Sequence, residues 1–183
     1  MALEESLIGS MNYNVLRDIL VSGKTMKLHR GAEVGVLYAD TTAHLLREFP
    51  KLKLYAVDPY LPYDECNDER SKANMLRCEK VACDRLKDFG DRAELLKMKS
   101  LEAVLMIPDI SLDFVFIDAM HTYEAVKEDI RAWFPKIRSG GIVAGHDYSW
   151  DGVKKAVDEF ELSSGLRGYM TPQLSDIWFF QKA

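Results

Sequence analysis

Apolar residues along the chain follow two patterns. In some segments they form short continuous runs, and in others they recur every three or four positions. The run Phe114–Ile117 is continuous and rich in aromatic and β-branched residues, which is typical of a strand buried on both faces. Beyond it, Tyr123, Val126, Ile130 and Trp133 recur at helical spacing. This pattern predicts a strand followed by an amphipathic helix.

A second strand is expected after this helix. Pro135 should end or kink the helix, because proline removes a backbone donor and clashes with the preceding turn. Ser139–Gly141 is a turn signal, and Ile142–Ala144 resumes an apolar run. The segment therefore predicts one strand–helix–strand unit with parallel strands.

The same alternation extends over the chain and predicts its fold class. Further helices are expected over Leu7–Val21, Asp40–Phe49, from a loop at Tyr60–Asp68 to about Phe89, over Ser100–Met106 and around Val153–Phe160. Further strands are expected over Ala32–Leu37, Leu52–Val57, Ala93–Met98, Leu166–Met170 and Ile177–Gln181. The last two strands have no helix between them, so they should pair as a hairpin. We predict an α/β fold, a Rossmann-like, doubly wound and mostly parallel seven-stranded sheet with a C-terminal antiparallel hairpin.

Composition limits the number of domains and the class of partner. A chain of 183 residues, 48% of them hydrophobic, can bury one good core and is short for two domains. We expect a single domain over residues 1–183, with residues 1–24 as an N-terminal cap helix. The 24 basic and 29 acidic residues give a net charge of −5, without a long basic run. Small molecules are therefore expected as partners, and nucleic acid is not.

Targeting patterns and cysteine spacing say little about the function of the chain. Glu4 and Glu5 stand where a secretion signal needs positive charge, and no run approaches the roughly 18 to 20 apolar residues that cross a bilayer. The chain has three cysteines, Cys66, Cys78 and Cys83, which is an odd number without a C-x-x-C pair. Neither a disulfide framework nor a structural zinc site is therefore indicated. We expect a cytoplasmic protein without a membrane partner.

Polar residues stand where the predicted parallel strands end. They are Glu33 and Gly35, Asp58, Ser100, Asp118 with His121, and His146 with Asp147. Each has an ordinary alternative, since acids at such places form turns or cap helices and single histidines are often structural. Carboxyl ends of parallel strands, however, lie along one edge, where α/β proteins bind ligands. One nucleotide-like ligand across that edge accounts for the whole set.

Two phosphate-binding motifs are excluded by spacing. The stretch Gly31–Ala39 lacks the G-x-G-x-x-G pattern of dinucleotide-binding turns. Gly23-Lys24-Thr25 fails as a phosphate loop, because Asp18 stands where that pattern needs glycine.

These residues resemble class I S-adenosylmethionine-dependent methyltransferases, especially the catechol-type and macrolide-sugar O-methyltransferases. In that family the first strand ends E-x-G-x-x-x-G and a small hydroxyl residue follows; here Glu33, Gly35, Ala39 and Thr41 occupy the frame, with Ala39 in place of the second glycine. The resemblance implies S-adenosylmethionine as cofactor. It further implies that Asp58 holds the ribose hydroxyls, that Ser100 contacts adenine and that Asp118 belongs to the cofactor site.

The resemblance also implies the catalytic chemistry. His121 lies three residues after Asp118, where catechol-type relatives place their base, and His146 is the second candidate. Asp118 and Asp147 match acidic ligands of a divalent metal ion. Two carboxylates suit Mg²⁺, whereas recruitment of a histidine would favour a softer metal.

Three functions stay open at this point. The leading one is O-methylation of a small hydroxylated metabolite. The others are a non-catalytic protein that binds S-adenosylmethionine or S-adenosylhomocysteine, and an enzyme that uses another nucleotide-like cofactor on the same fold. The family builds its acceptor pocket from the opening helix, the loop Tyr60–Asp68 and the segment Tyr148–Gly152, and Tyr60, Tyr63, Tyr148 and Trp150 are candidate aromatic walls. No large lid is inserted in the chain, so we expect either an open pocket or a homodimer in which a partner subunit covers it.

Overall fold

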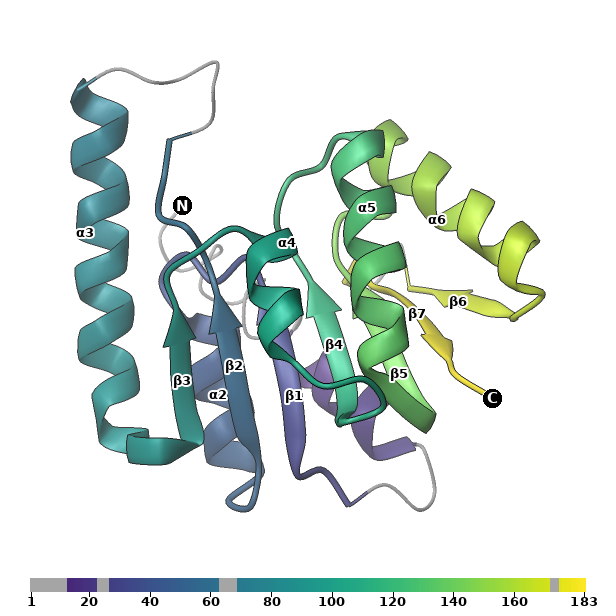
Figure 1. The fold of residues 1–183 in the computed structure, drawn as a ribbon, viewed down its shortest axis with the longest axis horizontal. Helices are drawn as coiled ribbons and strands as arrows, with labels where there is room; N and C mark the ends of the chain where they lie inside the picture. Colours follow the sequence, from purple (N-terminus) through teal and green to yellow (C-terminus); the bar gives the residue numbers. More distant parts are fainter. Residues whose placement is uncertain (1–12, 23–26, 63–68, 172–174) are drawn as a thin grey trace.

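One mixed sheet runs through the molecule, in the strand order β3-β2-β1-β4-β5-β7-β6. The computed structural model describes residues 13–22, 27–62, 69–171 and 175–183. The strands are β1 (Arg30–Val34), β2 (Lys53–Val57), β3 (Ala93–Leu96), β4 (Leu112–Ile117), β5 (Ile137–Gly145), β6 (Gly168–Met170) and β7 (Trp178–Gln181). The first five pair in parallel, whereas β7 pairs antiparallel with β5 and with β6 (Figure 1). The predicted fold class is confirmed.

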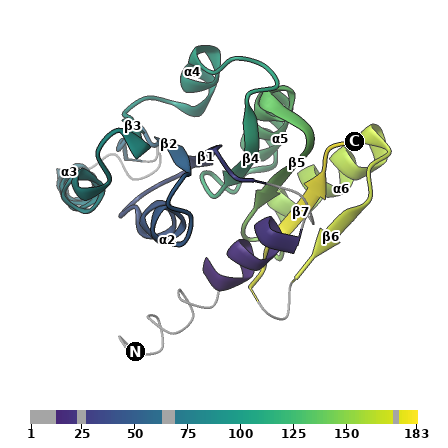
Figure 2. The same ribbon diagram turned by 90° about the horizontal axis from the view of Figure 1, so that it is seen from below.

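Helices cover both faces of the sheet. One face carries the helix formed by residues 13–22, α2 (Asp40–Glu48) and α3 (Glu69–Leu86). The other carries α4 (Ser100–Ala103), α5 (Tyr123–Trp133) and α6 (Asp151–Ser164) (Figure 2). Short 3₁₀ turns, Lys87–Arg92, Val104–Met106 and Phe134–Lys136, follow α3, α4 and α5. No helix in the described part of the chain is long and apolar enough to cross a membrane.

The core consists of two apolar layers, one on each side of the sheet. In β4 every residue is buried, as the apolar run Phe114–Ile117 predicts for most of the strand. Phe114 and Phe116 pack on the side of α2, and Val115 and Ile117 pack on the side of α5. Because side chains alternate across a strand, a strand buried on both faces must be apolar at nearly every position.

Asp113, at the start of β4, fastens the amino-terminal ends of three strands. Its Oδ2 accepts hydrogen bonds from the backbone amides of His29 and Arg30, the latter at 2.8 Å. Its Oδ1 accepts a hydrogen bond of 2.6 Å from Nε of Arg138 in β5. The carboxylate is buried and fully paired, so it acts as a structural clamp opposite the carboxyl edge of the sheet.

The structure corrects several predicted boundaries. Ser139–Gly141 is not a turn before a strand but lies inside β5, at a break in register against β4. Gly140 has a φ of +76° there, so the glycines form a bulge. The sequence pattern of this bulge resembles that of a turn. The first strand is Arg30–Val34 rather than Ala32–Leu37. Of the expected opening helix Leu7–Val21, residues 13–22 are helical, and the earlier part lies outside the described residues.

Candidate functional site

The turn between β1 and α2 packs directly on the loop that follows β4. Gly35 has a φ of +89°, and a Cβ atom at this position would lie 1.9 Å from the backbone oxygen of Asp118. Only glycine combines that backbone conformation with so close an approach. The two strand ends on either side of the sheet's topological switch point are thus in backbone contact, where α/β sheets bind ligands.

Ala39 stands in a left-handed conformation at the start of α2, with φ 59° and ψ 33°. Its amide donates a 2.7 Å hydrogen bond to the carbonyl of Val36, which closes the turn. Leu37, in the same turn, also has a positive φ of 47°. Each such residue costs about 1 kcal/mol relative to glycine. The turn therefore keeps the shape of the glycine-rich motif although Ala39 replaces its second glycine.

Glu33 lies buried beneath this turn, at the end of β1. Its carboxylate accepts a hydrogen bond from the hydroxyl of Thr42, and Thr41 also bonds to it. Burial raises the pKa of Glu33 to about 8 against these hydrogen bonds, which lower it. The side chain consequently holds a proton at neutral pH and ties β1 to the first turn of α2.

Asp58, after β2, braces the same turn from the other side. Its Oδ2 accepts hydrogen bonds from the amides of Val36 and Leu37, at 3.0 and 2.9 Å, and its Oδ1 accepts one from the amide of Tyr60 at 2.8 Å. A carboxylate offers about four acceptor sites, so these three bonds leave room for a further donor.

Ser100, at the start of α4, is turned toward α5. Its hydroxyl donates to the carboxylate of Asp129 and accepts a 2.8 Å hydrogen bond from Nε1 of Trp133. Burial raises the pKa of Asp129 to about 6, although the bond from Ser100 lowers it. The expected adenine-contacting side chain is thus part of a packed link between α4 and α5.

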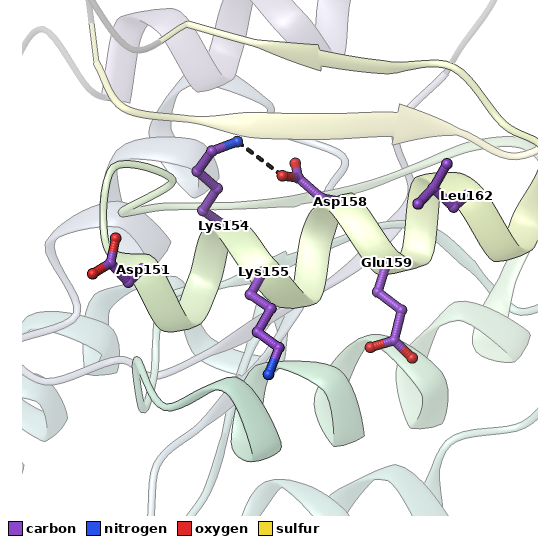
Figure 3. Close-up of a pocket in the computed structure, with 6 residues that line it drawn as sticks. All are labelled: Asp151, Lys154, Lys155, Asp158, Glu159 and Leu162. Atoms are coloured by element: carbon purple, nitrogen blue, oxygen red, sulfur yellow. Dashed lines mark hydrogen bonds and ion pairs between the residues drawn. The ribbon is translucent and has the colours of Figure 1, made fainter.

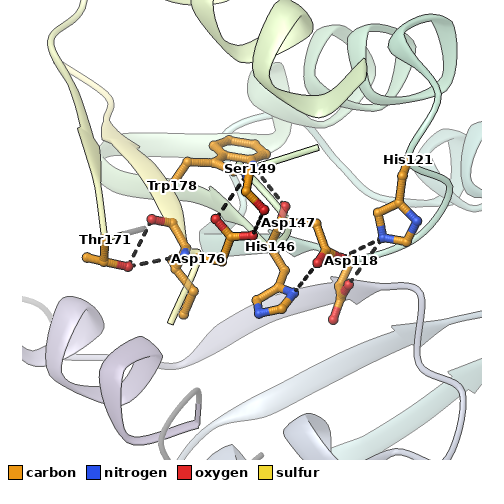
Figure 4. Close-up of polar contacts among 9 residues, drawn as sticks. Asp118, His121, His146, Asp147, Ser149, Thr171, Asp176 and Trp178 are labelled. Atoms are coloured by element: carbon orange, nitrogen blue, oxygen red, sulfur yellow. Dashed lines mark hydrogen bonds and ion pairs between the residues drawn. The ribbon is translucent and has the colours of Figure 1, made fainter. Parts of the chain in front are cut away.

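Asp118, His121 and Asp147 meet at the ends of β4 and β5 (Figure 4). Nε2 of His121 lies 2.7 Å from Oδ2 of Asp147 and 4.0 Å from Oδ1 of Asp118. The carboxylates of Asp118 and Asp147 raise the pKa of His121 to about 9, against the opposing effect of burial. The imidazole is therefore mostly protonated at neutral pH.

Asp147 also pairs with the histidine that precedes it. Nδ1 of His146 lies 3.2 Å from Oδ1 of Asp147. Burial lowers the pKa of His146, but the neighbouring carboxylates outweigh burial and raise it overall. Burial raises the pKa of Asp147, but the two histidines lower it by more. The pKa of Asp147 therefore lies well below its usual range. The carboxylate between two imidazoles is therefore ionised at neutral pH.

Comparison with known proteins identifies the family of the chain. A family model described as a methyltransferase domain matches residues 32–148, which is more than half of the chain. The chain belongs to this methyltransferase family. The expected kinship with S-adenosylmethionine-dependent methyltransferases is thereby confirmed, as is the expectation of an enzyme. No curated protein matches the chain.

Solved structures similar to this methyltransferase share its fold at low sequence identity. The O-methyltransferase from Bacillus cereus, solved in complex with S-adenosylhomocysteine, is 14% identical with a TM-score of 0.64, over 94% of this chain and 81% of that one. The O-methyltransferase NovP is 16% identical with a TM-score of 0.66, over 96% and 79%. CalS11, a calicheamicin methyltransferase, is 16% identical with a TM-score of 0.67, over 99% and 80%.

A shallow surface hollow lies along α6 of the methyltransferase, between Asp151 and Leu162 (Figure 3). Charged side chains line it, and they pair with one another, as Lys154 does with Asp158 at 2.8 Å. Lys127, on α5, pairs in the same way with Glu159 at 2.6 Å. The hollow is therefore a solvated helix surface rather than a ligand site.

Residues of the methyltransferase that the sequence pattern did not single out also shape the site. The hydroxyl of Thr42, beside that of the predicted Thr41, donates a hydrogen bond to Glu33. The carboxylate of Asp129 accepts a hydrogen bond from Ser100. Tyr13, on the helix of residues 13–22, has its pKa raised to about 12 by burial and by the charges of Asp40, Glu33 and, less strongly, Asp118. The sequence places Tyr13 only within the expected helix Leu7–Val21. Tyr63 lies outside the described residues.

Proposed function

We propose that this methyltransferase transfers the methyl group of S-adenosylmethionine to a hydroxyl oxygen of a small metabolite, and that His121 accepts the hydroxyl proton. The single observation that carries the proposal is the position of the His121 imidazole at the carboxyl edge of the sheet, where its Nε2 lies 2.7 Å from Asp147 and 4.0 Å from Asp118. A base must reach the proton that it removes, and here the imidazole is fixed beside the strand ends where ligands of such sheets bind.

We assign the cofactor to the strand ends on the β1 side of His121. Glu33, Gly35, Ala39 and Thr41 would surround the methionine part, Asp58 would hold the ribose, Ser100 would mark the adenine end and Asp118 would complete the site. The free acceptor site on the Asp58 carboxylate supports its role, since a ribose hydroxyl can donate there. Ser100 would act through its position, because its hydroxyl is already engaged with α5.

Methyl transfer from a sulfonium needs alignment more than activation. The protein holds acceptor and methyl group at near-attack distance, which is worth several orders of magnitude in rate. His121 then takes the proton as the oxygen attacks. Because the pKa of His121 is about 9, the neutral imidazole becomes more abundant as pH rises toward 9. The rate should therefore rise with pH over this range, and His146 is the second candidate base.

We further propose that a divalent cation can be held at this site. One ligand atom from each of Asp118, His121 and Asp147 lies within 4.8 Å of the others, and the two carboxylates concentrate negative charge there. Mg²⁺ was expected from two carboxylates, but an imidazole nitrogen in the set favours a borderline transition metal. A coordinated imidazole nitrogen cannot also accept a proton, so a bound cation would act in place of His121 as base, by lowering the pKa of the acceptor hydroxyl.

Calorimetric titration with S-adenosylmethionine, S-adenosylhomocysteine, NAD and ATP tests the cofactor. Only the two adenosyl compounds with sulfur should bind. His121→Ala should keep S-adenosylhomocysteine affinity and lose methyl transfer to a hydroxylated acceptor by about 100-fold or more. Equal transfer in wild type and His121→Ala would contradict the proposal, as would binding of NAD in place of the sulfur compounds.

Treatment with EDTA followed by addition of Mg²⁺, Mn²⁺ or Zn²⁺ tests the metal. If only one of these ions restores activity, the result supports a cation at this site. The identity of that ion then shows which ligand chemistry the site prefers. Unchanged activity after complete chelation would leave His121 as a metal-independent base and contradict the cation.

A further inference from the structure

Arg85, in the last turn of α3, reaches the turn between β1 and α2. Its Nη1 donates a 2.6 Å hydrogen bond to the carbonyl of Tyr38 and lies 2.5 Å from Oδ1 of Asp40. These two residues flank Ala39, which has a left-handed conformation. The negative end of the α3 dipole favours a cation at this place. One guanidinium group therefore holds the turn on both sides of Ala39.

The peptide group between Tyr38 and Ala39 is fixed at both of its polar ends. Arg85 holds its carbonyl oxygen, and its amide donates the 2.7 Å hydrogen bond to the carbonyl of Val36. Because a peptide group is planar, a change in the φ of Ala39 rotates this whole group relative to the rest of the residue. Such a rotation would break both hydrogen bonds. The two bonds together hold Ala39 at a φ of 59°, where residues other than glycine are disfavoured.

The helix that carries Arg85 is itself firmly placed. Cys78, Ala82 and Leu86 form the buried side of α3, so this side packs on the core. The hydroxyl of Tyr38 is also hydrogen-bonded to Cys78. Tyr38 is therefore held by α3 through its backbone and through its side chain, and Arg85 acts from a rigid support.

Asp58 supports only the first half of the same turn. Its carboxylate accepts hydrogen bonds from the amides of Val36 and Leu37, which precede the peptide group that Arg85 holds. Glycine at position 39 would adopt the left-handed conformation without strain. Alanine is strained there, so the second half of the turn relaxes unless a contact from outside the turn restrains it.

We propose that Arg85 is a positioning residue, which holds the peptide group between Tyr38 and Ala39 in the left-handed turn and so keeps the cofactor site in its binding conformation. The inference rests on the proposed contact of this turn with the methionine part of the cofactor. Arg85 acts through the turn rather than on the cofactor. Its effect on affinity should therefore depend on which residue stands at position 39.

Substitution of Arg85 in two backgrounds tests the proposal. Arg85→Met keeps the aliphatic stem and removes the donors. Calorimetric titration should show S-adenosylhomocysteine binding about fivefold weaker in this variant, because the strain of one left-handed alanine favours a relaxed, non-binding turn by about that factor. In the Ala39→Gly background, the same substitution should weaken binding by about twofold or less.

Two further variants serve as controls. Arg70→Met removes the same charge from an exposed residue in the first turn of α3, and it should leave the affinity unchanged in both backgrounds. Arg85→Lys should recover part of the affinity that Arg85→Met loses, because an ammonium group can still donate to the carbonyl of Tyr38. Arg85→Lys also carries the comparison of backgrounds if Arg85→Met does not fold.

The comparison of backgrounds separates positioning of the turn from other roles. An equal loss of affinity in the wild-type and Ala39→Gly backgrounds would overturn the inference, because Arg85 would then act on the cofactor itself or on packing in general. Unchanged affinity in Arg85→Met would overturn it as well. In both cases S-adenosylhomocysteine still binds to the wild-type protein, so the proposed function stands.

Failure of the proposed function gives a different result. If the wild-type protein does not bind S-adenosylhomocysteine, the proposed function fails, and urea denaturation still tests the contact of Arg85 with the turn. Only the alanine turn gains free energy by relaxing. Arg85→Met should therefore reduce the folding equilibrium constant by a factor about threefold smaller in the wild-type background than in the Ala39→Gly background. Equal reductions would overturn the inference.

Discussion

The carboxylate of Asp147 lies 2.7 Å from the imidazole of His121, although the two residues come from loops after different strands. The parallel pairing of β4 with β5 brings those loops together. Asp147 has a φ of 57°, a conformation that asparagine adopts readily. Asp147→Asn therefore removes the charge without straining the backbone.

We expect Asp147→Asn to lower the pKa of His121 from about 9 toward its ordinary value, by at least about 1 pH unit, because a neighbouring negative charge is lost. A histidine with a raised folded-state pKa stabilises the protein below about pH 6.5, and this stabilisation is lost as pH rises through 9. The stability difference between wild type and variant should therefore shrink from pH 6 to pH 10. NMR titration of the imidazole and denaturation at several pH values measure both effects.

The control for this prediction is Asp109→Asn, an exposed carboxylate paired with Lys136. It should leave the titration of His121 unchanged. An equal titration midpoint in wild type and Asp147→Asn would show that the short contact does not exist in solution.

Gly35→Ala should destabilise the protein severely, because its Cβ would collide with the backbone oxygen of Asp118 at 1.9 Å and its φ is positive. We expect a loss of about 3 kcal/mol or more, together with loss of S-adenosylhomocysteine binding. Gly140→Ala is the matched control. Gly140 also has a positive φ, but no atom lies within 4 Å of the place that an added methyl group would take, so about 1 kcal/mol of strain is expected. Equal losses in urea denaturation would contradict the close approach.

Glu33→Gln should change how stability depends on pH. The pKa of Glu33 is about 8 in the folded protein because of burial, whereas in the unfolded chain it is near 4.3. Between these values the unfolded state loses the proton and the folded state keeps it, so wild-type stability falls as pH rises. Glutamine does not titrate and still accepts the hydrogen bond from Thr42. The variant should gain on wild type by up to about 1.4 kcal/mol per pH unit.

Urea denaturation at pH 5, 6, 7 and 8 measures this gain. The same substitution at Glu69, whose side chain is 92% exposed, serves as the control and should give a curve parallel to wild type. A constant offset between Glu33→Gln and wild type at all four pH values would mean that Glu33 is ionised in the folded protein.

Ala39→Gly should change cofactor affinity more than stability. Glycine relieves about 1 kcal/mol of left-handed strain, and loss of a buried methyl group costs about 0.8 kcal/mol, so the free energy of unfolding should change little. The turn would offer more room to the methionine part of the cofactor, and S-adenosylhomocysteine should bind more tightly by calorimetry. Weaker binding in Ala39→Gly would show that the methyl group of Ala39 supports the cofactor.

Local pattern was sufficient to predict most of the sheet and its helices. The unbroken apolar run of β4 and the helical spacing of α5 each report directly which faces are buried. The bulge at Gly140 was missed because glycine signals a turn and a bulge equally, and only the neighbouring strand decides between them. Boundaries such as that of β1 depend on hydrogen bonds to β2 and β4, which no short window contains.

The strand order explains why the candidate site was partly predictable. Residues at the ends of parallel strands must share an edge, which places Asp118 near Asp147 whatever their side chains do. Side-chain partners are a different matter. The bonds of Ser100 to Asp129 and of Asp58 to the amide of Val36 depend on rotamers and on the packing of elements distant in sequence. The contact of the Trp150 ring with His121 and the bond of Arg85 to the carbonyl of Tyr38 have the same origin.

The missing side chain at Gly35 has a mechanical consequence for the two halves of the sheet. With no atoms between the turn after β1 and the carbonyl of Asp118, one cannot shift without displacing the other. We therefore expect a displacement of this turn toward β4 to be transmitted to the loop after β4 through the peptide backbone itself.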